Sequence, residues 1–493
     1  MEKFTFAGQP GLKLLTDGQV ATIHDHALRI LDACGVQFES DEALKILKDH
    51  GARVDFGRKV ARLKPELVLE AIRSAPSHIL LHSRDGNPVA DLGGANVYFD
   101  PGSAAIRFLE SDGRTVRPSH AADLAAISLV NDALPHIALQ STAVVCYDVP
   151  KSIGDSYRLY LLLKNSPKPI ITGAFSVSGV GHMRDLLAAV AGGADVLRER
   201  PVAVFDVCPS PPLKWTHISS RNIIDCARNW LPMETVSMPM PGAASPATIA
   251  GSILLHTVET LSGLTLAQCA CRGTPVVYGG APVHFDMRHG TTALGAVEAT
   301  MIAAGYAQMG KFYGLPTHTY ACLSDSKLVD AQAGLETAMS AIIAQLAGLN
   351  VISGPGILEF VSCLSLEKLV IDNEICGLAL RLHRGLDWSE EAMAADLIAT
   401  LGPGGNYLTA RHTAKWFRRE LHLPTMIIDR RDRNRWQAEG GTDSFQRARL
   451  RVREILDGHR PAPLGSDREQ ALDRAATRIM DEAGVAEVPL GPR

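Results

Sequence analysis

Short apolar runs rich in β-branched residues alternate with longer amphipathic stretches through the middle of this chain. The short runs are bounded by Gly, Pro, Asn and Asp, as strands commonly are. Eight of them occur, at "NVYFD" (96–100), 136–145, 169–175, 202–208, 233–238, 275–280, 316–321 and 350–354. Between them apolar residues recur three and four positions apart. This spacing predicts helices at 119–132, 150–165, 178–197, 215–230, 246–270, 292–311, 328–347 and 365–384.

Strands that alternate with helices of ten or more residues predict parallel βαβ units, and therefore an α/β fold. Eight such units are the number found in a (β/α)8 TIM barrel, which we place at residues 95–386. An open doubly wound sheet is the alternative, but the G-x-G-x-x-G turn expected after its first strand is absent from the sequence. In a barrel, chemistry gathers at the carboxyl ends of the strands.

The two ends of the chain have other patterns. Residues 17–75 have the periodicity of amphipathic helices, and 77–117 contain short runs separated by turn residues, as in hairpins. Residues 387–493 are polar, helical in pattern and rich in Arg. We therefore expect an N-terminal helical and β-hairpin extension at 1–94 and a C-terminal helical extension at 387–493.

Composition narrows the class of protein. Hydrophobic residues make up 46% of the 493 residues, charged residues 21%, and the formal net charge is -4, which is ordinary for a globular enzyme. The sequence contains no long basic run of the kind that binds nucleic acid. It also contains neither a secretory signal nor a run of roughly 18 apolar residues, so we expect no membrane association. The nine cysteines include no C-x-x-C pair, so we expect reduced thiols in a cytoplasmic protein.

Polar side chains gather between the seventh strand and its helix, in "LSDSKLVDAQAGLE" (323–336). Asp325 and Lys327 fall where a barrel holds catalytic groups, and Glu359 follows the eighth strand. Ser324 and Lys327 also have the S-x-x-K spacing of penicillin-recognising acyl transferases, but the companion K-T-G is missing. The structural alternative is that Ser324 or Asp325 caps the following helix.

Other candidates for substrate contacts lie at or near the ends of strands. Aromatic faces attract a quaternary ammonium through cation–π interaction, and neighbouring strand residues face opposite ways, so we expect two or three aromatics to line the site. The H-x-D-x-x-H run that begins at His284 is not a recognised metal spacing, and we expect no bound metal. The candidate substrate-binding residues are Tyr147, Phe175, Phe205, Tyr278, His284, His318 and Tyr320.

Four motifs, in order along the chain, resemble those of the trimethylamine methyltransferase family. They are "SPATIAG" (245–251), "LSDSKLVDAQAGLE", "LEKLVIDNEICGLALRLHRGL" (366–386) and "LGPGGNYLTARHTAKWFRRE" (401–420). The likeness runs over about residues 15–465 and is strongest from 240 to 430. It is greater to the branch without pyrrolysine, which acts on quaternary amines such as glycine betaine.

The resemblance implies a barrel enzyme that moves a methyl group from an amine to the Co(I) of a corrinoid (cobalamin). A separate corrinoid protein carries that group, so no cofactor is bound directly. Archaeal members use pyrrolysine, whereas this sequence has only standard residues, which favours a quaternary amine over trimethylamine. A quaternary ammonium already carries a neutral leaving group, so the site needs mainly to position it and exclude water. The expected substrate is a small quaternary or tertiary amine, and the chain is expected to form a homo-oligomer.

The sequence departs from the family at the eighth strand. The family reads close to NLIH-D-x-G-x-LESG there, whereas this chain has "NVISGPGILEFV" (350–361). Ser353 and Gly354 replace the His and the Asp, and only Leu358 and Glu359 persist. The loss of that histidine implies a changed substrate or a changed activity.

Two other functions stay open at this point. One is a barrel that binds a quaternary amine without turning it over. The other is a metal-free hydrolase or lyase with Asp325, Lys327 and Glu359 as acid and base groups. S-adenosylmethionine is not expected, because no Gly-rich turn follows an early strand.

Overall fold

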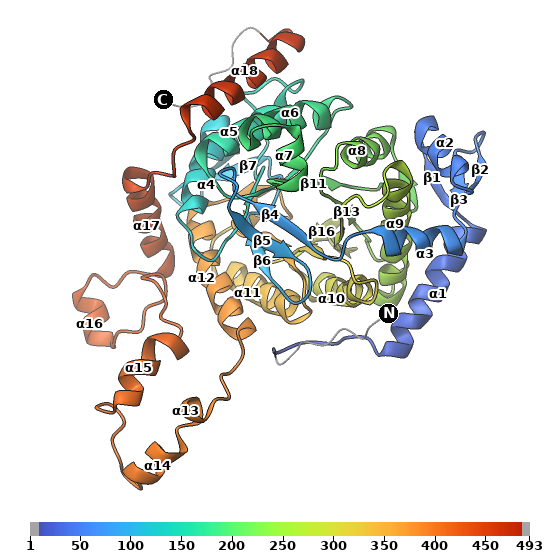
Figure 1. Cartoon of the computed structure of the whole chain (residues 1–493). Coiled ribbons are helices and arrows are strands. Elements are labelled where there is room, and N and C mark those ends of the chain that lie inside the picture. Colours follow the sequence, from blue (N-terminus) through green and yellow to red (C-terminus); the bar gives the residue numbers. More distant parts are fainter. Residues whose placement is uncertain (1–8, 486–493) are drawn as a thin grey trace.

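The computed structural model describes residues 9–485 as a body of strands surrounded by helices, from which a C-terminal segment extends (Figure 1). All eight strands expected from the sequence are present. They are β6 (Tyr98–Asp100), β9 (Gln140–Ser141), β10 (Ile170–Gly173), β11 (Ala203–Val207), β13 (Met233–Ser237), β14 (Val276–Gly280), β17 (His318–Tyr320) and β18 (Val351–Ser353).

Parallel pairing joins these strands into two sheets rather than one closed ladder. One sheet has the order β14-β13-β11-β10-β9, and the other has the order β17-β18-β6. The sheets touch at both edges. At one edge Tyr278 forms a parallel bridge with Thr317, and at the other the Leu139 N–H donates to the Phe99 carbonyl at 3.2 Å. The α/β class is therefore confirmed, whereas the single closed sheet of the predicted barrel is not formed.

A helix follows each of these strands, as expected. The one helix predicted at 178–197 is divided in two, because Gly192 and Gly193 adopt φ of 95° and 135° and interrupt helical geometry. The helices are α4 (Ala121–Asp132), α5 (Gly154–Asn165), α6 (Gly179–Ala191), α7 (Ala194–Glu199), α8 (His217–Arg228), α9 (Ile249–Ala270), α10 (Val297–Phe312), α11 (Ala331–Leu346) and α12 (Leu366–His383).

Helix α9 is the longest helix among the described residues and has apolar residues all round. Its length and hydropathy alone would suit a membrane span, which the sequence prediction missed because Ser, Thr, His and Glu interrupt the apolar run. However, 72% of its most apolar window is buried inside the protein. It packs against α1 (Asp17–Ala33), α3 (Pro65–Ser74), α8 and α10, which explains a composition without a polar face.

The N-terminal extension contains α1, α2 (Asp41–Asp49), α3 and a small sheet of order β12-β1-β3-β2. Thr16 and Gln19 form a capping box that starts α1, and Pro65 occupies the first turn of α3. The strand β12 comes from the central body, so this sheet joins the extension to it. The strands are β1 (Val36–Phe38), β2 (Arg53–Asp55), β3 (Val60–Arg62) and β12 (Lys214–Trp215).

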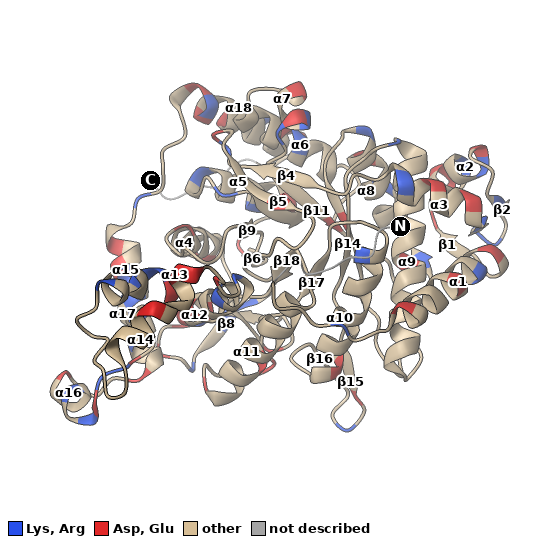
Figure 2. Cartoon of the chain, turned by 60° about the horizontal axis from the view of Figure 1, so that its bottom comes forward, with Lys and Arg blue, Asp and Glu red and all other residues tan. Residues whose placement is uncertain are grey.

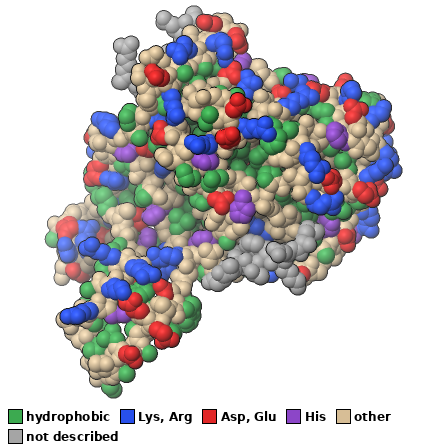
Figure 3. Space-filling view, viewed as in Figure 1, with side chains coloured by type: hydrophobic (Ala, Val, Ile, Leu, Met, Phe, Trp, Pro, Cys, Tyr) green, Lys and Arg blue, Asp and Glu red, His purple; other side chains and the backbone are tan. Residues whose placement is uncertain are grey.

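An antiparallel hairpin, β4 (Ile79–His82) and β5 (Pro88–Leu92), lies across the middle of the strands in Figure 1. Its buried Ile79, Leu81, Ala90 and Leu92 pack against Leu139, Ile171, Val204, Val277 and Val351. These partners lie in the amino-terminal halves of the parallel strands or, for Leu139, directly before one, so the hairpin closes that end. On the face that carries it, acidic and basic side chains are interspersed (Figure 3). The hairpin does not cover the opposite, carboxyl end of the strands, where a functional site can form.

Additional short strands lie at the carboxyl end of the parallel strands. The hairpin of β15 (His284–Asp286) and β16 (Thr291–Ala293) projects from the body (Figure 2). A separate four-stranded sheet has the order β19-β20-β7-β8 and brings the segment after β18 beside the segment after β6. Its strands are β7 (Arg107–Leu109), β8 (Val116–Pro118), β19 (Ile357–Leu358) and β20 (Cys363–Leu364).

The C-terminal extension is helical, as expected. Its last two helices cover the body: α17 packs on α12 and α4, and α18 packs on α6 and α5. The preceding part stands away from the body (Figure 1), and Trp388 and Leu408 are 74% and 83% exposed there. The helices are α13 (Glu390–Met393), α14 (Ala395–Leu401), α15 (Arg411–Glu420), α16 (Arg433–Ala438), α17 (Ser444–Gly458) and α18 (Ser466–Glu482).

Candidate active site

A cavity of about 480 Å³ lies at the carboxyl ends of the parallel strands. That size suits a small ligand. Every one of the eight strands contributes a residue at its end or in the loop that follows it. These residues include Ser103 after β6, Thr142 after β9, Gly173 of β10, Asp206 of β11, Val236 of β13, Ala281 after β14, Tyr320 of β17 and Phe360 after β18.

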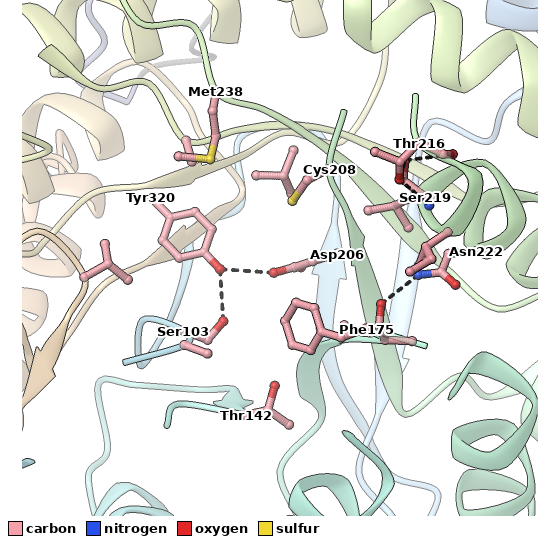
Figure 4. Close-up of a pocket in the computed structure, with 18 of the residues that line it drawn as sticks. Ser103, Thr142, Phe175, Asp206, Cys208, Thr216, Ser219, Asn222, Met238 and Tyr320 are labelled. Atoms are coloured by element: carbon pink, nitrogen blue, oxygen red, sulfur yellow. Dashed lines mark hydrogen bonds between the residues drawn. The ribbon is translucent and has the colours of Figure 1, made fainter. Parts of the chain in front are cut away.

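The walls of the cavity are mainly apolar, and its polar groups converge from different strands (Figure 4). Three apolar side chains that line it are also open to solvent: Phe175 is 65% exposed, Ile218 39% and Met238 37%. Asn222, from α8, donates through Nδ2 to the Ala174 carbonyl at 2.7 Å and holds the loop that carries Phe175. The cavity therefore has an apolar interior and an apolar, solvent-exposed rim.

Tyr320 and Asp206 form the polar centre of the cavity. The Tyr320 hydroxyl donates to Asp206 Oδ2 at 3.0 Å and lies 3.0 Å from Ser103 Oγ (Figure 4). The second oxygen of Asp206, Oδ1, is buried and has no hydrogen-bond partner among the described residues. The Asp206 carboxyl therefore lines the cavity with Oδ2 held by Tyr320, whereas its Oδ1 is buried.

Two further carboxyl groups, Asp100 of β6 and Glu234 of β13, lie completely buried near Asp206. Burial is the main cause that raises the pKa of all three groups, and repulsion from Asp206 raises the pKa of Asp100 and Glu234 further. Hydrogen bonds from Tyr320 and Glu234 partly oppose the shift at Asp206. Burial therefore disfavours the ionised forms of Asp100, Asp206 and Glu234, and a bound cation would favour them.

His318 connects the members of this cluster. Its Nε2 lies 2.9 Å from Ser353 Oγ, which donates to Asp100 Oδ1 at 2.6 Å, and its Nδ1 lies 3.4 Å from Glu234 Oε1. Burial lowers the pKa of His318 to about 3. Because the pKa of Glu234 is raised at the same time, burial disfavours the charged form of both partners in this contact. Ser353, which departs from the family pattern, is thus a bridge in this network.

The cavity is lined by one cationic side chain, Arg158 of α5, which is 3% exposed. Its Nη1 donates to the Thr142 carbonyl at 3.1 Å, and its guanidinium carbon lies 5.3 Å from the centre of the Phe175 ring. Its Nη2 lies 3.7 Å from Asp155 Oδ1. Among residues 9–485, Arg158 and Asp206 are the charged side chains that line the cavity.

The five predicted aromatics are divided by the direction of their side chains. Phe175 and Tyr320 line the cavity. Tyr147 is 60% exposed outside it, and Phe205 is buried in the main hydrophobic core behind the sheet. Tyr278 is also buried behind the sheet, where its hydroxyl donates to Thr257 Oγ1 of α9 at 3.0 Å. Phe205 points away because its neighbour Asp206 faces inward and successive strand residues alternate.

The predicted Asp325 supports the cavity wall rather than its interior. Its Oδ1 and Oδ2 accept from the Leu294 and Gly295 N–H groups at 3.1 and 2.9 Å, and Leu294 lines the cavity. Burial raises the pKa of Asp325 to about 6. The helix α11 is capped by Asp330, whose side chain accepts from the Ala333 N–H. The capping alternative therefore fits this segment, but the residue that caps is Asp330, not Ser324 or Asp325.

The predicted Lys327 and Glu359 hold a turn that lines the cavity. Glu359, Phe360 and Val361 have φ of 50°, 58° and 65°, a left-handed conformation that is unfavourable for such residues. Glu359 pairs with Arg107 at 3.3 Å and donates its N–H to the Ser326 carbonyl at 3.1 Å. Lys327 Nζ lies 4.2 Å from the centre of the Phe360 ring. These contacts keep Phe360 and Val361 at the cavity, where both are lining residues.

The predicted histidines do not line the cavity. His284 lies in the projecting β15–β16 hairpin, and His318 lies buried beneath the cavity in the carboxyl network. Between residues 9 and 485, no group of three His, Cys, Asp or Glu side chains is placed to hold a metal ion.

Sequence interpretation missed the carboxyl cluster and Arg158. A signal for the cluster was present, because Asp100, Asp206 and Glu234 each interrupt an apolar strand of a parallel sheet, where an acid is costly. Arg158 gave a weaker signal, since an Arg in an amphipathic helix is usually solvated.

The chain is similar in sequence to known methyltransferases over nearly its full length. The family model described as trimethylamine methyltransferase (MTTB) matches residues 3–484. A trimethylamine methyltransferase MttB of Desulfitobacterium hafniense is 33% identical over 476 residues, which cover 97% of this chain and 96% of that protein. A glycine betaine methyltransferase of the same species is 33% identical over 477 residues, covering 96% and 98%.

Solved structures give a more distant likeness. The crystal structure of the monomethylamine methyltransferase of Methanosarcina barkeri (MtmB) superposes with a TM-score of 0.55 at 13% identity. The superposition covers 98% of this chain and 90% of that one. At this identity the comparison supports the α/β fold alone.

Proposed function

The chain belongs to the trimethylamine methyltransferase family and is a methyltransferase, and we propose that it moves a methyl group from a quaternary or tertiary amine to the Co(I) of a corrinoid held by a partner protein. The observation that carries the proposal is the cavity at the strand ends, whose apolar walls surround an acidic centre. Relatives with that activity cover almost the whole chain. The preference for a quaternary amine, such as a betaine, rests on the absence of pyrrolysine from the sequence.

The acidic centre is proposed to hold the ammonium group. Asp206 lines the cavity, and Tyr320 orients its Oδ2. A permanent cation next to Asp206 favours ionisation of the cluster, so the ammonium is bound by charge inside an apolar enclosure. The aromatic faces of Phe175 and Tyr320 add cation–π attraction. This assignment replaces the predicted role of Tyr147, Phe205 and Tyr278 in binding.

The transfer itself breaks the C–N bond, and the bonding electron pair leaves with the nitrogen. The corrinoid supplies, from Co(I), the electron pair of the new bond to the methyl carbon. A quaternary amine releases a neutral amine, so the chain then needs no acid at the moment of transfer. A tertiary amine would have to be protonated before transfer so that its leaving amine is neutral. Its own contribution is to orient the amine and to exclude water with apolar walls such as Val236, Ala281 and Leu294.

The partner is proposed to dock at the rim. Phe175, Ile218 and Met238 expose apolar surface at the cavity, which suits the face of a large planar ring system. Asp325, Lys327 and Glu359 are proposed to keep the walls in place rather than to react. The nine free cysteines accord with a cytoplasmic reaction.

The two touching sheets are proposed to act as one (β/α)8 barrel, with residues 95–386 as the catalytic domain between the two extensions. The Tyr278–Thr317 bridge and the Leu139–Phe99 hydrogen bond support this, because each spans a gap between the sheets. A homo-oligomer is also proposed, for which the exposed apolar residues of the C-terminal extension provide surface.

The test is an assay of methyl transfer. The purified chain, a corrinoid protein reduced to Co(I), and one amine at a time (glycine betaine, carnitine, choline or trimethylamine) are mixed, and the corrinoid spectrum is followed. Methylation with at least one quaternary amine is expected. Absence of transfer from all of them, with a corrinoid protein that is competent in another methyl-transfer system, would overturn the proposal. The family relatives do not favour the non-catalytic or hydrolytic alternatives.

A further inference from the structure

Arg158 is a buried cation whose acidic partner, Asp155, is shared with the backbone of the loop that carries Phe175. The carboxylate within 4 Å of it is that of Asp155, at 3.7 Å. Asp155 Oδ2 already accepts from the Phe175 N–H at 2.6 Å, and burial raises the pKa of Asp155. A guanidinium removed from water is costly unless an anion pairs with it closely. The cavity that Arg158 lines is the open space from which such an anion can come.

The two charged side chains that line the cavity come from different elements, Arg158 from helix α5 and Asp206 from strand β11. Arg158 belongs to the helix side, with Thr142 and Phe175 as neighbours. Asp206 belongs to the strand side, hydrogen-bonded to Tyr320 and close to the buried Glu234. Apolar walls fill the rest of the lining. A cavity with one cation, one acidic group and apolar walls is complementary to a small zwitterion with bulky methyl groups.

Resting on the proposed function, we infer that Arg158 binds a carboxylate of the substrate while Asp206 faces its ammonium, so that the enzyme is specific for betaines over amines without a carboxylate. The planar guanidinium can hold a carboxylate through two parallel hydrogen bonds. Binding at two points of opposite charge also fixes the direction of the molecule, which a single cation site does not.

Arg158 also has a structural role that the test must separate. It joins α5 to the segment after β9 through the Thr142 carbonyl and packs over Phe175. A change of Arg158 that only loosens this region would weaken every ligand alike. Glycine betaine and choline carry the same trimethylammonium group and differ in a carboxylate against a hydroxyl, so comparing them within one variant cancels the structural effect.

The experiment is calorimetric binding of glycine betaine and of choline to the purified full chain, without a corrinoid protein. Wild type is expected to bind glycine betaine more tightly. Arg158→Met is expected to lose about 30-fold or more in betaine affinity, as truncation of a buried charge pair does, and less than about threefold for choline. Arg158→Lys, which keeps the charge, should recover part of the betaine affinity. Asp155→Asn is the matched control, because it changes the same neighbourhood without removing the cation.

Each other outcome is decisive. Equal losses for both ligands in Arg158→Met would overturn the inference and leave Arg158 a structural residue. A wild type that binds choline as well as glycine betaine would overturn it too, while the methyltransferase proposal would stand if either amine is demethylated. Binding of glycine betaine without methyl transfer from any amine would sink the proposed function and leave the role of Arg158 in carboxylate binding intact.

Discussion

Tyr320 and Asp206, from strands β17 and β11, meet in the cavity, where the tyrosine hydroxyl donates to the carboxylate at 3.0 Å. The two residues are more than a hundred positions apart in sequence, and their strands belong to different sheets. The hydrogen bond favours the ionised form of an acid whose pKa burial raises. It therefore partly offsets the effect of burial on the charge of the cavity.

Tyr320→Phe removes this hydrogen bond and keeps the ring. The pKa of Asp206 should rise further, because the ionised form loses a donor. Binding of a quaternary amine should weaken by about 1 kcal/mol, roughly fivefold, near pH 7. The increase of binding affinity with pH should also shift to higher pH. Calorimetric titrations between pH 6 and 9 measure both effects, and an unchanged pH profile would contradict the role given to Tyr320.

Asp206→Asn removes the acid that faces the cavity. Affinity for a quaternary amine should fall by about 2 kcal/mol, because this cation has no N–H and is held by Coulomb attraction to the carboxylate in a partly desolvated site. In the wild type, affinity for a quaternary amine should increase with pH, because a cation prefers the ionised carboxyl and the pKa of Asp206 is raised. The variant should lose most of this increase.

The matched control for Asp206→Asn is Asp49→Asn, which makes the same charge change at an exposed residue paired with Lys45 at the end of α2. It should leave binding unaltered at every pH. If both variants bind alike, the pH dependence does not come from the cavity.

Phe175→Leu keeps apolar area at the rim but removes the π face. A quaternary amine should lose roughly 0.5–1 kcal/mol, at the lower end for cation–π contacts, because the ring is 65% exposed. A neutral analogue with a tert-butyl group should lose less. Phe205→Leu is the comparison variant: it should lower the free energy of unfolding without separating the two ligands, because Phe205 lies in the core. Equal losses in Phe175→Leu would mean that the ring supplies only shape.

Asp325→Asn tests whether this carboxyl is structural. An Asp with a pKa of about 6 in the folded chain and roughly 3.9 when unfolded takes up a proton on folding between these values. Its contribution to stability is complete below pH 4 and is lost as pH rises through 6. Relative to the variant, the wild type should therefore lose up to about 3 kcal/mol from pH 4 to pH 7. Urea unfolding at several pH values measures this. A flat difference would mean that Asp325 ionises as a solvated acid.

The alternation of strands and helices could be recognised from local patterns alone. Each of the eight parallel strands, and each helix from α4 to α12 apart from the division of α6 and α7, lies within a few residues of its expected place, because strand and helix periodicities depend on side chains close in sequence. The short strands β12, β15 and β16 were not expected. The division at Gly192 and Gly193 was within reach of the same reasoning. The family motifs were equally local, and the family they indicated is the one to which the chain belongs.

The tertiary structure decided which residues form the site. In "AVFDV" the sequence shows Phe205 and Asp206 side by side, but only the curvature and pairing of β11 determine that the acid faces the cavity and the ring the core. Arg158 reaches the cavity from a helix, and Asp325 turns toward a loop thirty residues earlier. The sequence by itself determined the order and type of the elements, since these follow from neighbours along the chain. The packing of strands distant in sequence decided which side chains meet. The burial of a side chain, which shifts its pKa and so its charge, arises only when those strands come together.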